Sequence, residues 1–468
     1  MEKSKLVRVL NTLSKIEIRE FKKYLASPIH NQRADVQDLL ALILAYLLNK
    51  SPMPDKASFY KELFPTQPFD LIKFDLLISY LFRLLKKYLA WKEWEQNDFI
   101  GELAVVRQLK KRGLKEDAQQ ILEKLKKDLE KQPFRDATYF NNLQKLQWEQ
   151  HLLSDTNSPQ KEAEKWAMST NLDQYYFAKK LKQYCLLLSY QQVYPFEYEL
   201  PFIEQILVEI IDTKQVEIPI IAVYFHCIKM LKQGEDVANF LNFKTKLFEH
   251  QALFPTHEFR PLLLAGINYS VRQVNIGEKQ FLKELLDLYK TGLKTASLLE
   301  NGQLSRITYH NIVGTGINNQ ELDWTAHFIS SYKNKLERKY RESTYSFSLA
   351  RLAYQKKDYD AVLQLLQKSN YRDLLLNLAA KTLLLKVYVE QDQDALLFPH
   401  LEAMQRYIRR KHIMGYHKKN YLNIIKYTKK MRSLNFFDKT EIAAFTKTVQ
   451  TEEVLTEKSW FIEQLSTF

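Results

Sequence analysis

Glycine and proline are scarce in this chain of 468 residues, which contains ten glycines and thirteen prolines. Both residues interrupt helices, while leucine, lysine, glutamine, glutamate and alanine, which dominate here, favour them. No segment alternates apolar and polar residues for long enough to predict a strand. The composition therefore predicts an all-α fold.

Cysteine is also rare: Cys185 and Cys227 are the only two, and each lies within an apolar helical pattern. Two cysteines supply neither a disulfide framework nor a zinc site. We expect buried, reduced thiols. The chain also lacks a phosphate-binding loop, an H-E-x-x-H sequence and a C-x-x-C sequence. We therefore expect no enzyme, with no catalytic residue, cofactor or metal ligand.

Long apolar runs are missing as well. The longest, LLALILAYLL at 39–48, has about half of the roughly 20 residues that a membrane helix needs. The first residues are basic but do not resemble a secretory leader. We expect a soluble, cytoplasmic protein that does not enter a membrane. The net charge of +14 favours acidic partners without choosing among them.

Break signals along the chain predict four segments. The stretch from Ser14 to Glu17 has the pattern of a helix capping box, in which serine and glutamate side chains each accept a backbone N–H. Helices are expected at about 160–168 and 172–192, among others. The predicted segments are 1–98, an N-terminal helical module; 99–300, irregular helical hairpins; 301–450, regular repeats with basic C-terminal helices; and 451–468, a capping helix.

A repeat is visible between 352–366 and 385–399. Tyr354 recurs as Tyr388 and Ala361 as Ala395, each at an offset of 34 residues. An earlier copy, at an offset of 35 residues, contains Trp324 and aligns Ala326 with Ala361. Each copy predicts helix, tight turn and helix. We expect the small alanine early in the second helix to let two helices approach closely.

At these residues the chain resembles the tetratricopeptide family, whose 34-residue repeat is a helical hairpin. The resemblance is clearest over 305–410, where Gly314 matches the small-residue position of a first helix. It implies a tetratricopeptide-like α-solenoid of antiparallel hairpins after the N-terminal module, with a concave binding face. The whole chain, through LSKIEIREFKKYLASPIHN and FYKELFP, also resembles an uncharacterised bacterial family of helical-repeat proteins, which implies no known function.

Positive charge concentrates at 401–435, which holds ten lysines and arginines and one acidic residue, Glu402. Helical spacing puts cationic side chains on one face of each of two consecutive helices, opposite the apolar face. These candidate anion-binding or partner-binding residues are Arg406, Arg409, Arg410, Lys419, Lys426 and Lys430.

The sequence leaves the meaning of these cationic faces open. One interpretation is an ordinary solvated helix face, and the other is a patch that binds anions. The leading functional hypothesis is a non-enzymatic interaction or scaffold protein that holds an acidic protein or peptide. The alternative is a nucleic-acid-binding protein that uses the basic helices. The sequence does not set the oligomeric state.

Overall fold

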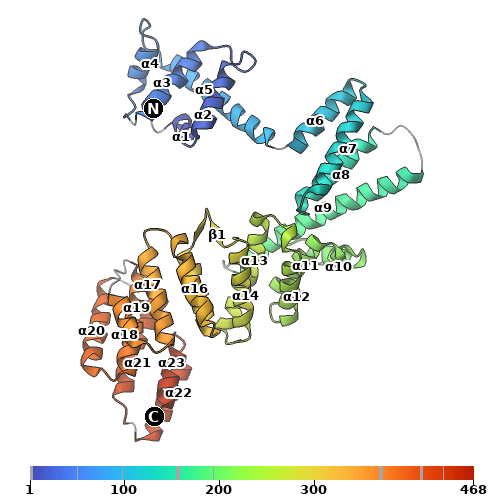
Figure 1. Cartoon of the computed structure of the whole chain (residues 1–468). Coiled ribbons are helices and arrows are strands. Elements are labelled where there is room, and N and C mark those ends of the chain that lie inside the picture. The colour runs from blue at the N-terminus through green and yellow to red at the C-terminus, as the bar shows by residue number, and fades with distance from the viewer. Residues whose placement is uncertain are drawn as a thin grey trace. The chain divides into compact units, whose positions relative to one another are not determined.

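The computed structural model describes residues 4–49, 51–96, 98–153, 159–192, 194–367, 373–411, 415–435 and 437–467. Nearly all regular structure in these residues is α-helix (Figure 1). The prediction of an all-α chain is confirmed. The chain divides into two compact units, Met1–Tyr176 and Phe177–Phe468. The predicted division into four segments stays a prediction.

The first five helices share one apolar core. The predicted capping box is confirmed, because Ser14 and Glu17 exchange side-chain and backbone hydrogen bonds at the start of α2. Tyr88 of α5 is buried, and its hydroxyl donates to the Glu17 carbonyl, which ties α5 to α2. The helices are α1 (Lys5–Leu10), α2 (Lys15–Ala26), α3 (Ala34–Leu48), α4 (Lys56–Leu63) and α5 (Leu71–Glu95).

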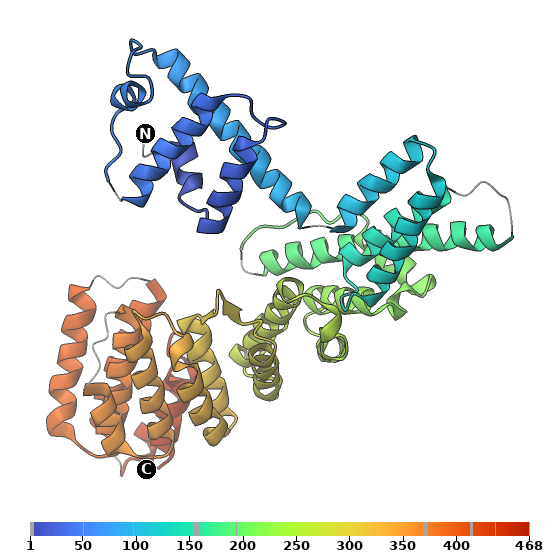
Figure 2. The ribbon, with the colours of Figure 1, turned by 45° about the horizontal axis from the view of Figure 1, so that its top comes forward.

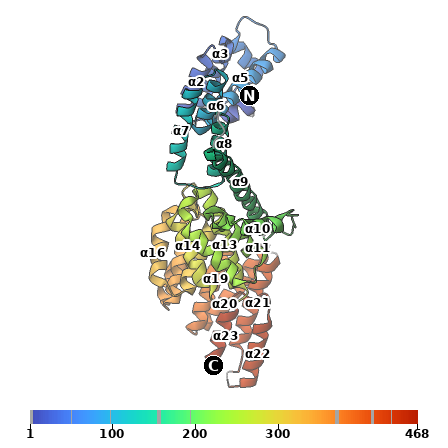
Figure 3. The ribbon, with the colours of Figure 1, turned by 90° about the vertical axis from the view of Figure 1, so that its right-hand side faces the viewer.

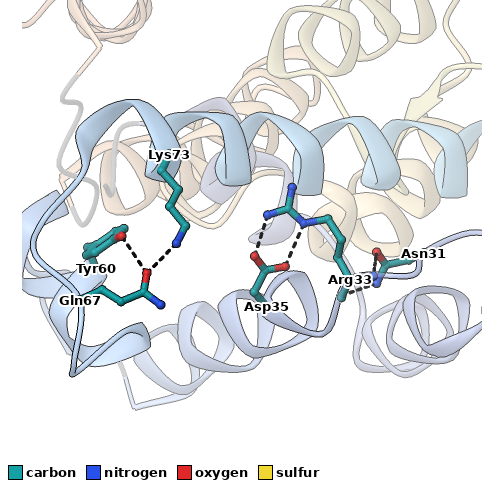
Figure 4. Close-up of polar contacts among 6 residues, drawn as sticks. All are labelled: Asn31, Arg33, Asp35, Tyr60, Gln67 and Lys73. Carbon is teal, nitrogen blue, oxygen red and sulfur yellow. Dashed lines mark hydrogen bonds and ion pairs between the residues drawn. The ribbon is translucent and has the colours of Figure 1, made fainter.

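Polar side chains fix the loops of this core (Figure 4). The buried amide of Asn31 donates to the carbonyls of Leu25 and Arg33, so it replaces the backbone partners that the end of α2 lacks. Gln67 accepts from Lys73 at 2.6 Å and so holds the loop between α4 and α5. These contacts account for ordered turns at the predicted helix breaks.

The next helices are α6 (Asp98–Lys111), α7 (Lys115–Lys131), α8 (Ala137–His151) and α9 (Pro159–Gln191). The prediction of separate helices at about 160–168 and 172–192 is wrong, because α9 runs unbroken for 33 residues (Figure 2). The residues expected to separate them, Ser169 to Asn171, include neither glycine nor proline. Without such a breaker, the weak helix propensity of these residues does not end the helix.

From α11 onward, the helices pack as successive antiparallel pairs in chain order (Figures 1 and 2). Before them come α10 (Ile203–Asp212) and the 3₁₀ turn η1 (Gln215–Glu217). The pairs are α11 (Pro219–Lys232) with α12 (Val237–Glu249), α13 (Thr256–Asn275) with α14 (Phe281–Lys294), α15 (Arg306–Asn318) with α16 (Leu322–Tyr332), α17 (Arg341–Gln355) with α18 (Tyr359–Gln367), and α19 (Leu374–Glu390) with α20 (Asp394–Arg410). Further 3₁₀ turns are η2 (Gln251–Leu253) and η3 (Lys333–Lys335).

Four of these pairs share the same turn. Their first helix ends in a left-handed residue: Gly277, Gln320, Lys357 or Asp392. In each case two backbone N–H groups return to the last helical carbonyls, as in a Schellman motif. In the α17 turn, for example, the amide of Lys357 donates to the Tyr354 carbonyl. Backbone bonds therefore define this turn, whichever residue stands in it.

The turns correct the predicted repeat register. At the end of α17, the left-handed residue donates its backbone N–H to the carbonyl of Tyr354. At the end of α19, the left-handed residue donates to the carbonyl of Val389. Tyr354 therefore matches Val389, and Tyr388 is one residue out of register. The left-handed residues Lys357 and Asp392 lie 35 residues apart, not 34. The shared tyrosines and aspartates suggested a pairing that the backbone geometry does not follow.

The predicted role of the alanines is wrong at Ala395 and stays a prediction at Ala326 and Ala361. Ala395 is exposed, and Ala326 and Ala361 are only half-buried. A close approach lies at Gly316 of α15, where an added Cβ would overlap Thr325 Oγ1 of α16. In the turn alignment, Trp324 matches Ala361.

A short hairpin corrects the expectation that the chain has no strand. β1 (Leu299–Glu300) pairs with β2 (Gln303–Leu304) in antiparallel register. Asn301 and Gly302 between them both have positive φ, of 50° and 76°, as a two-residue type I′ turn requires. An Asn-Gly pair is a strong signal for this turn. Strands of two residues, however, are too short to show an alternation of apolar and polar residues.

The last three helices are α21 (Gly415–Arg432), α22 (Lys439–Thr451) and α23 (Lys458–Ser466). α22 and α23 pair beside α21 (Figure 3), and their buried side chains join one apolar cluster with α19 and α20. Trp460 of α23 is 6% exposed, and its indole N–H donates to Glu390 of α19 at 2.7 Å. Glu390 also accepts from the hydroxyls of Tyr354 and Tyr359. One carboxylate thus joins α17, α18, α19 and α23.

Candidate functional site

A groove lies between the second half of α9 and α13, with α11 at its floor. Its cavity measures about 520 Å³, and most of its surface is apolar. All its residues belong to the unit Phe177–Phe468. The lining residues are Lys179, Lys182, Gln183, Cys185, Leu186, Ser189 and Tyr190 of α9; Tyr194 after it; Tyr224 and Cys227 of α11; and Glu258, Pro261, Leu262, Leu264, Ala265 and Asn268 of α13.

Helical periodicity explains why these residues gather. On α9, Lys179, Gln183, Leu186 and Tyr190 recur every three or four residues, so they share one face. Another face of α9 carries buried side chains such as Leu181 and packs into the core. The groove is therefore the face of α9 that the core leaves uncovered.

The rim of the groove presents large apolar side chains to solvent. Leu186, Tyr190 and Tyr194 are 51%, 46% and 58% exposed. The rings of Tyr190 and Tyr194 lie 6.1 Å apart, so they form one aromatic edge. Exposed apolar groups that cluster over a cavity are typical of a binding surface, whereas single ones are ordinary.

A buried carboxylate lies at the floor. Glu258 is 5% exposed, accepts a hydrogen bond from the Tyr224 hydroxyl at 3.1 Å and pairs with the ammonium of Lys182. Burial and then the charge of Glu258 raise the pKa of Tyr224 well above its ordinary value. The phenol therefore stays protonated and serves as a donor. Both carboxylate oxygens of Glu258 therefore have a hydrogen-bond partner, and Lys182 neutralises the negative charge in the groove.

Both cysteines line this groove and both are buried, as the sequence predicted. The Cys185 thiol lies 3.5 Å from the carbonyl oxygen of Tyr224. Burial first, and then the neighbouring Cys227, raise the pKa of Cys185 well above its ordinary value. A protonated, buried thiol is a poor nucleophile. The two sulfur atoms therefore act here as apolar packing groups.

Positive charge flanks the apolar middle of the groove. Lys179 is exposed at one end, and at the other Arg272 of α13 donates to the side chain of Gln192. Burial lowers the pKa of Arg272. Among the described lining residues the only acidic one is Glu258, which Lys182 neutralises. The electrostatics therefore favour an occupant with carboxylates beside an apolar segment.

The basic residues predicted from the sequence fall on two different surfaces. Arg406, Arg409 and Arg410 are exposed on α20, where they line a depression of about 710 Å³ together with Lys381 of α19. Their grouping on one side of α20 was predicted. The contribution of Lys381 was missed because α19 shows no cationic pattern around it.

Acidic residues of α22 and the segment after it compensate the second basic surface. Lys419, Lys426 and Lys430 are exposed on α21, as helical spacing predicted. Lys430 pairs with Glu441 at 3.0 Å. The pKa of Glu452 is lowered mainly by the Tyr427 hydroxyl and also by the charges of Lys419 and Lys426. The opposite, apolar face of α21 is buried, as predicted.

Sequence reasoning did not single out the groove. The signal was present in the spacing of apolar residues on α9, but the same spacing describes a core face. Only the position of α11 and α13 shows which α9 face stays open. Across the described parts of the chain, no group of three or more histidines, cysteines and carboxylates is placed to hold a metal. No helix within the same residues is long and apolar enough to span a membrane.

The chain was compared with protein-family models, with curated proteins and with solved structures, and none of the three comparisons found a match. The candidate site therefore depends on the geometry of this chain alone.

Proposed function

We propose that this chain is a non-enzymatic interaction protein that binds a peptide segment of a partner protein in the groove of α9, α11 and α13. The segment would be apolar in its middle and acidic at its ends. The observation that carries this proposal is the aromatic and aliphatic rim, Leu186, Tyr190 and Tyr194, exposed above an open apolar cavity.

The architecture in this proposal is a tetratricopeptide-like α-solenoid. Successive antiparallel pairs with one shared turn from α13 to α20 support it. In such a solenoid the first helices of the pairs line one face, and peptides bind there. α11 and α13 are first helices of their pairs, so the groove would lie on that face.

The energetics also support a peptide ligand. Buried apolar surface contributes about 25 cal/mol per Å², so covering the rim side chains gives several kcal/mol before the cost of ordering the peptide. Exposed tyrosines are favourable anchors because they lose little conformational entropy and keep a polar hydroxyl. The charges of Lys179 and Arg272 would select acidic flanks and speed association.

The polar groups of the groove favour binding over catalysis. The Cys185 thiol and the Tyr224 phenol both have raised pKa values, so neither is an activated nucleophile or base at neutral pH. Glu258 already has two partners. These groups therefore support a structural role at the floor of a binding groove.

A random-peptide display library tests the proposal. The full-length protein would be used for selection, and the enriched peptides measured by titration calorimetry. We expect apolar cores with neighbouring aspartate or glutamate. Leu186→Asp or Tyr190→Ala should weaken these peptides by at least about tenfold, as for an interface anchor.

Leu172→Ala is the matched control, because Leu172 is also exposed on α9, at 47%, but does not line the groove. Its affinity should equal that of the unmodified chain. Peptides that bind all three variants equally well would show that the groove is not the binding site.

A further inference from the structure

A second surface, on α19 and α20, carries more positive than negative charge. We call it the arginine depression: Arg406, Arg409 and Arg410, with Lys381, Ala403 and Tyr407. It belongs to different helices from the groove. The peptide-binding proposal does not account for it.

Few carboxylates lie near the depression. Glu402 is exposed one helical turn before Arg406, and their charged atoms are 3.5 Å apart. Asp373 contributes charge near Tyr407 but pairs with Arg306 at 2.8 Å. Among the described residues no carboxylate forms an ion pair with Arg409 or Arg410. On α21, Glu441 likewise pairs with one lysine, but a second carboxylate, Glu452, also interacts with the charges of Lys419 and Lys426.

Lys381 adds a cation from α19 to the depression. Its backbone carbonyl is hydrogen-bonded to a ring nitrogen of His400 at 2.8 Å, and its ammonium lies 5.9 Å from the centre of the Tyr407 ring. The side chain is half-buried, and burial lowers its pKa. A partly desolvated ammonium gains more from an incoming anion than a fully hydrated one does.

We propose that the arginine depression binds the phosphate backbone of single-stranded nucleic acid. Three guanidinium groups within two helical turns can each donate two parallel hydrogen bonds to a phosphate. Closely spaced phosphates along one strand suit a cluster of this kind. Tyr407 adds an aromatic ring at the same surface, and bases stack on such rings. This inference is independent of the proposed peptide groove.

Fluorescence anisotropy with a labelled uridine oligonucleotide tests the inference on the full-length chain. Arg406→Gln, Arg409→Gln and Arg410→Gln together should weaken binding at least about tenfold at moderate salt. The slope of log affinity against log salt should fall by about 2, because each single-strand phosphate contact contributes about 0.7. Lys381→Gln alone should reduce the slope by about 0.7.

The matched control removes the same charge from α21, as Lys419→Gln, Lys426→Gln and Lys430→Gln together. Its effect on affinity should be clearly smaller. Equal losses in both triple variants would overturn the proposal, because binding would then follow net charge and not this surface. An unchanged affinity in the arginine variant would also overturn it.

Competition by polyglutamate of matched charge distinguishes a nucleic-acid ligand from an acidic protein ligand. We expect it to compete at least about tenfold more weakly than the unlabelled oligonucleotide, because it offers neither phosphates nor bases. Equal competition would overturn the nucleic-acid assignment and indicate an acidic polypeptide as the ligand. Circular dichroism of each variant would verify that the helical fold is retained.

Discussion

His310 is a titratable ring placed in the contact between α15 and α17. Both ring nitrogens are buried without a hydrogen-bond partner among the described residues. Burial first, and then Arg351 and Arg306, lower its pKa to about 4, while Asp373 acts in the opposite direction. Because the unfolded chain takes up this proton near pH 6.5, the folded state loses stability as pH falls from about 6.5 to about 4.

The predicted effect is up to about 3 kcal/mol at pH 4 relative to neutral pH. His310→Phe should remove this part of the pH dependence, since phenylalanine carries no proton and the neighbouring Phe347 is aromatic. Urea unfolding midpoints of both proteins, measured from pH 7 to pH 4, provide the test. Parallel pH profiles would contradict the assignment to His310.

Lys182 and Glu258 act as a pair, so the loss of one partner should cost more than the loss of both. Lys182→Met leaves a buried carboxylate with only Tyr224 as its partner, and we expect a loss of about 1–3 kcal/mol. Adding Glu258→Leu should recover most of it, because the unpaired charge is then gone. The midpoints of thermal unfolding would show this, with Lys179→Met as an exposed-lysine control.

The left-handed turn that the helix pairs share gives a prediction about the stability of one pair, α17 with α18. Lys357 adopts φ of +57°, which costs a side-chain-bearing residue about 1 kcal/mol and glycine nothing. We therefore expect Lys357→Gly either to leave the stability of the α17–α18 pair unchanged or to raise it by up to about 1 kcal/mol. Lys356→Gly, one residue earlier and at a negative φ of −83°, should destabilise it. Hydrogen exchange of α17 amides would distinguish the two variants.

The final helix is attached through Trp460. Trp460→Ala should cost about 3–5 kcal/mol, because it opens a cavity and removes one donor from Glu390. Trp460→Phe keeps most of the packing and should cost less. We expect faster hydrogen exchange in α23 in the alanine variant. Unchanged protection there would show that Trp460 does not hold the helix.

The sequence predicted helices and their ends best where a feature depends only on residues close together in the chain. The capping box at Ser14 and the apolar face of α21 follow from neighbouring residues, and the structure confirms both. The repeat register failed for a physical reason. Backbone bonds close the turns, so a glutamine, a lysine or an aspartate can stand at the left-handed position, and residue identity does not mark it.

At the scale of the whole molecule, function depends on which surfaces are left uncovered. Sequence spacing grouped the basic residues of α20 and α21 as two similar stripes. The structure separates them, because Glu441 and Glu452 lie beside α21 and Lys381 joins α20. For the groove, the spacing of apolar residues on α9 did not distinguish an open face from a core face. Long-range packing determines which helix faces stay exposed and which charges are compensated. The spacing of residues along the sequence does not reveal this packing.

The two proposed surfaces should act independently. Changes in the groove, such as Tyr190→Ala, should leave oligonucleotide affinity unchanged, and the arginine triple variant should leave peptide affinity unchanged within about twofold. Titrating each ligand in the presence of the other provides the measurement. A shift of tenfold or more, about 1.4 kcal/mol, would show that the sites are coupled.

Glu390 also imposes an order on how this region is completed during synthesis. Two of its donors, Tyr354 and Tyr359, leave the ribosome before it, but Trp460 follows 70 residues later. Until then, Glu390 is without its indole partner and the apolar surfaces that Trp460 and Phe461 cover are open to other chains. A nascent chain stalled before α23 should therefore bind chaperones more strongly than one stalled after it.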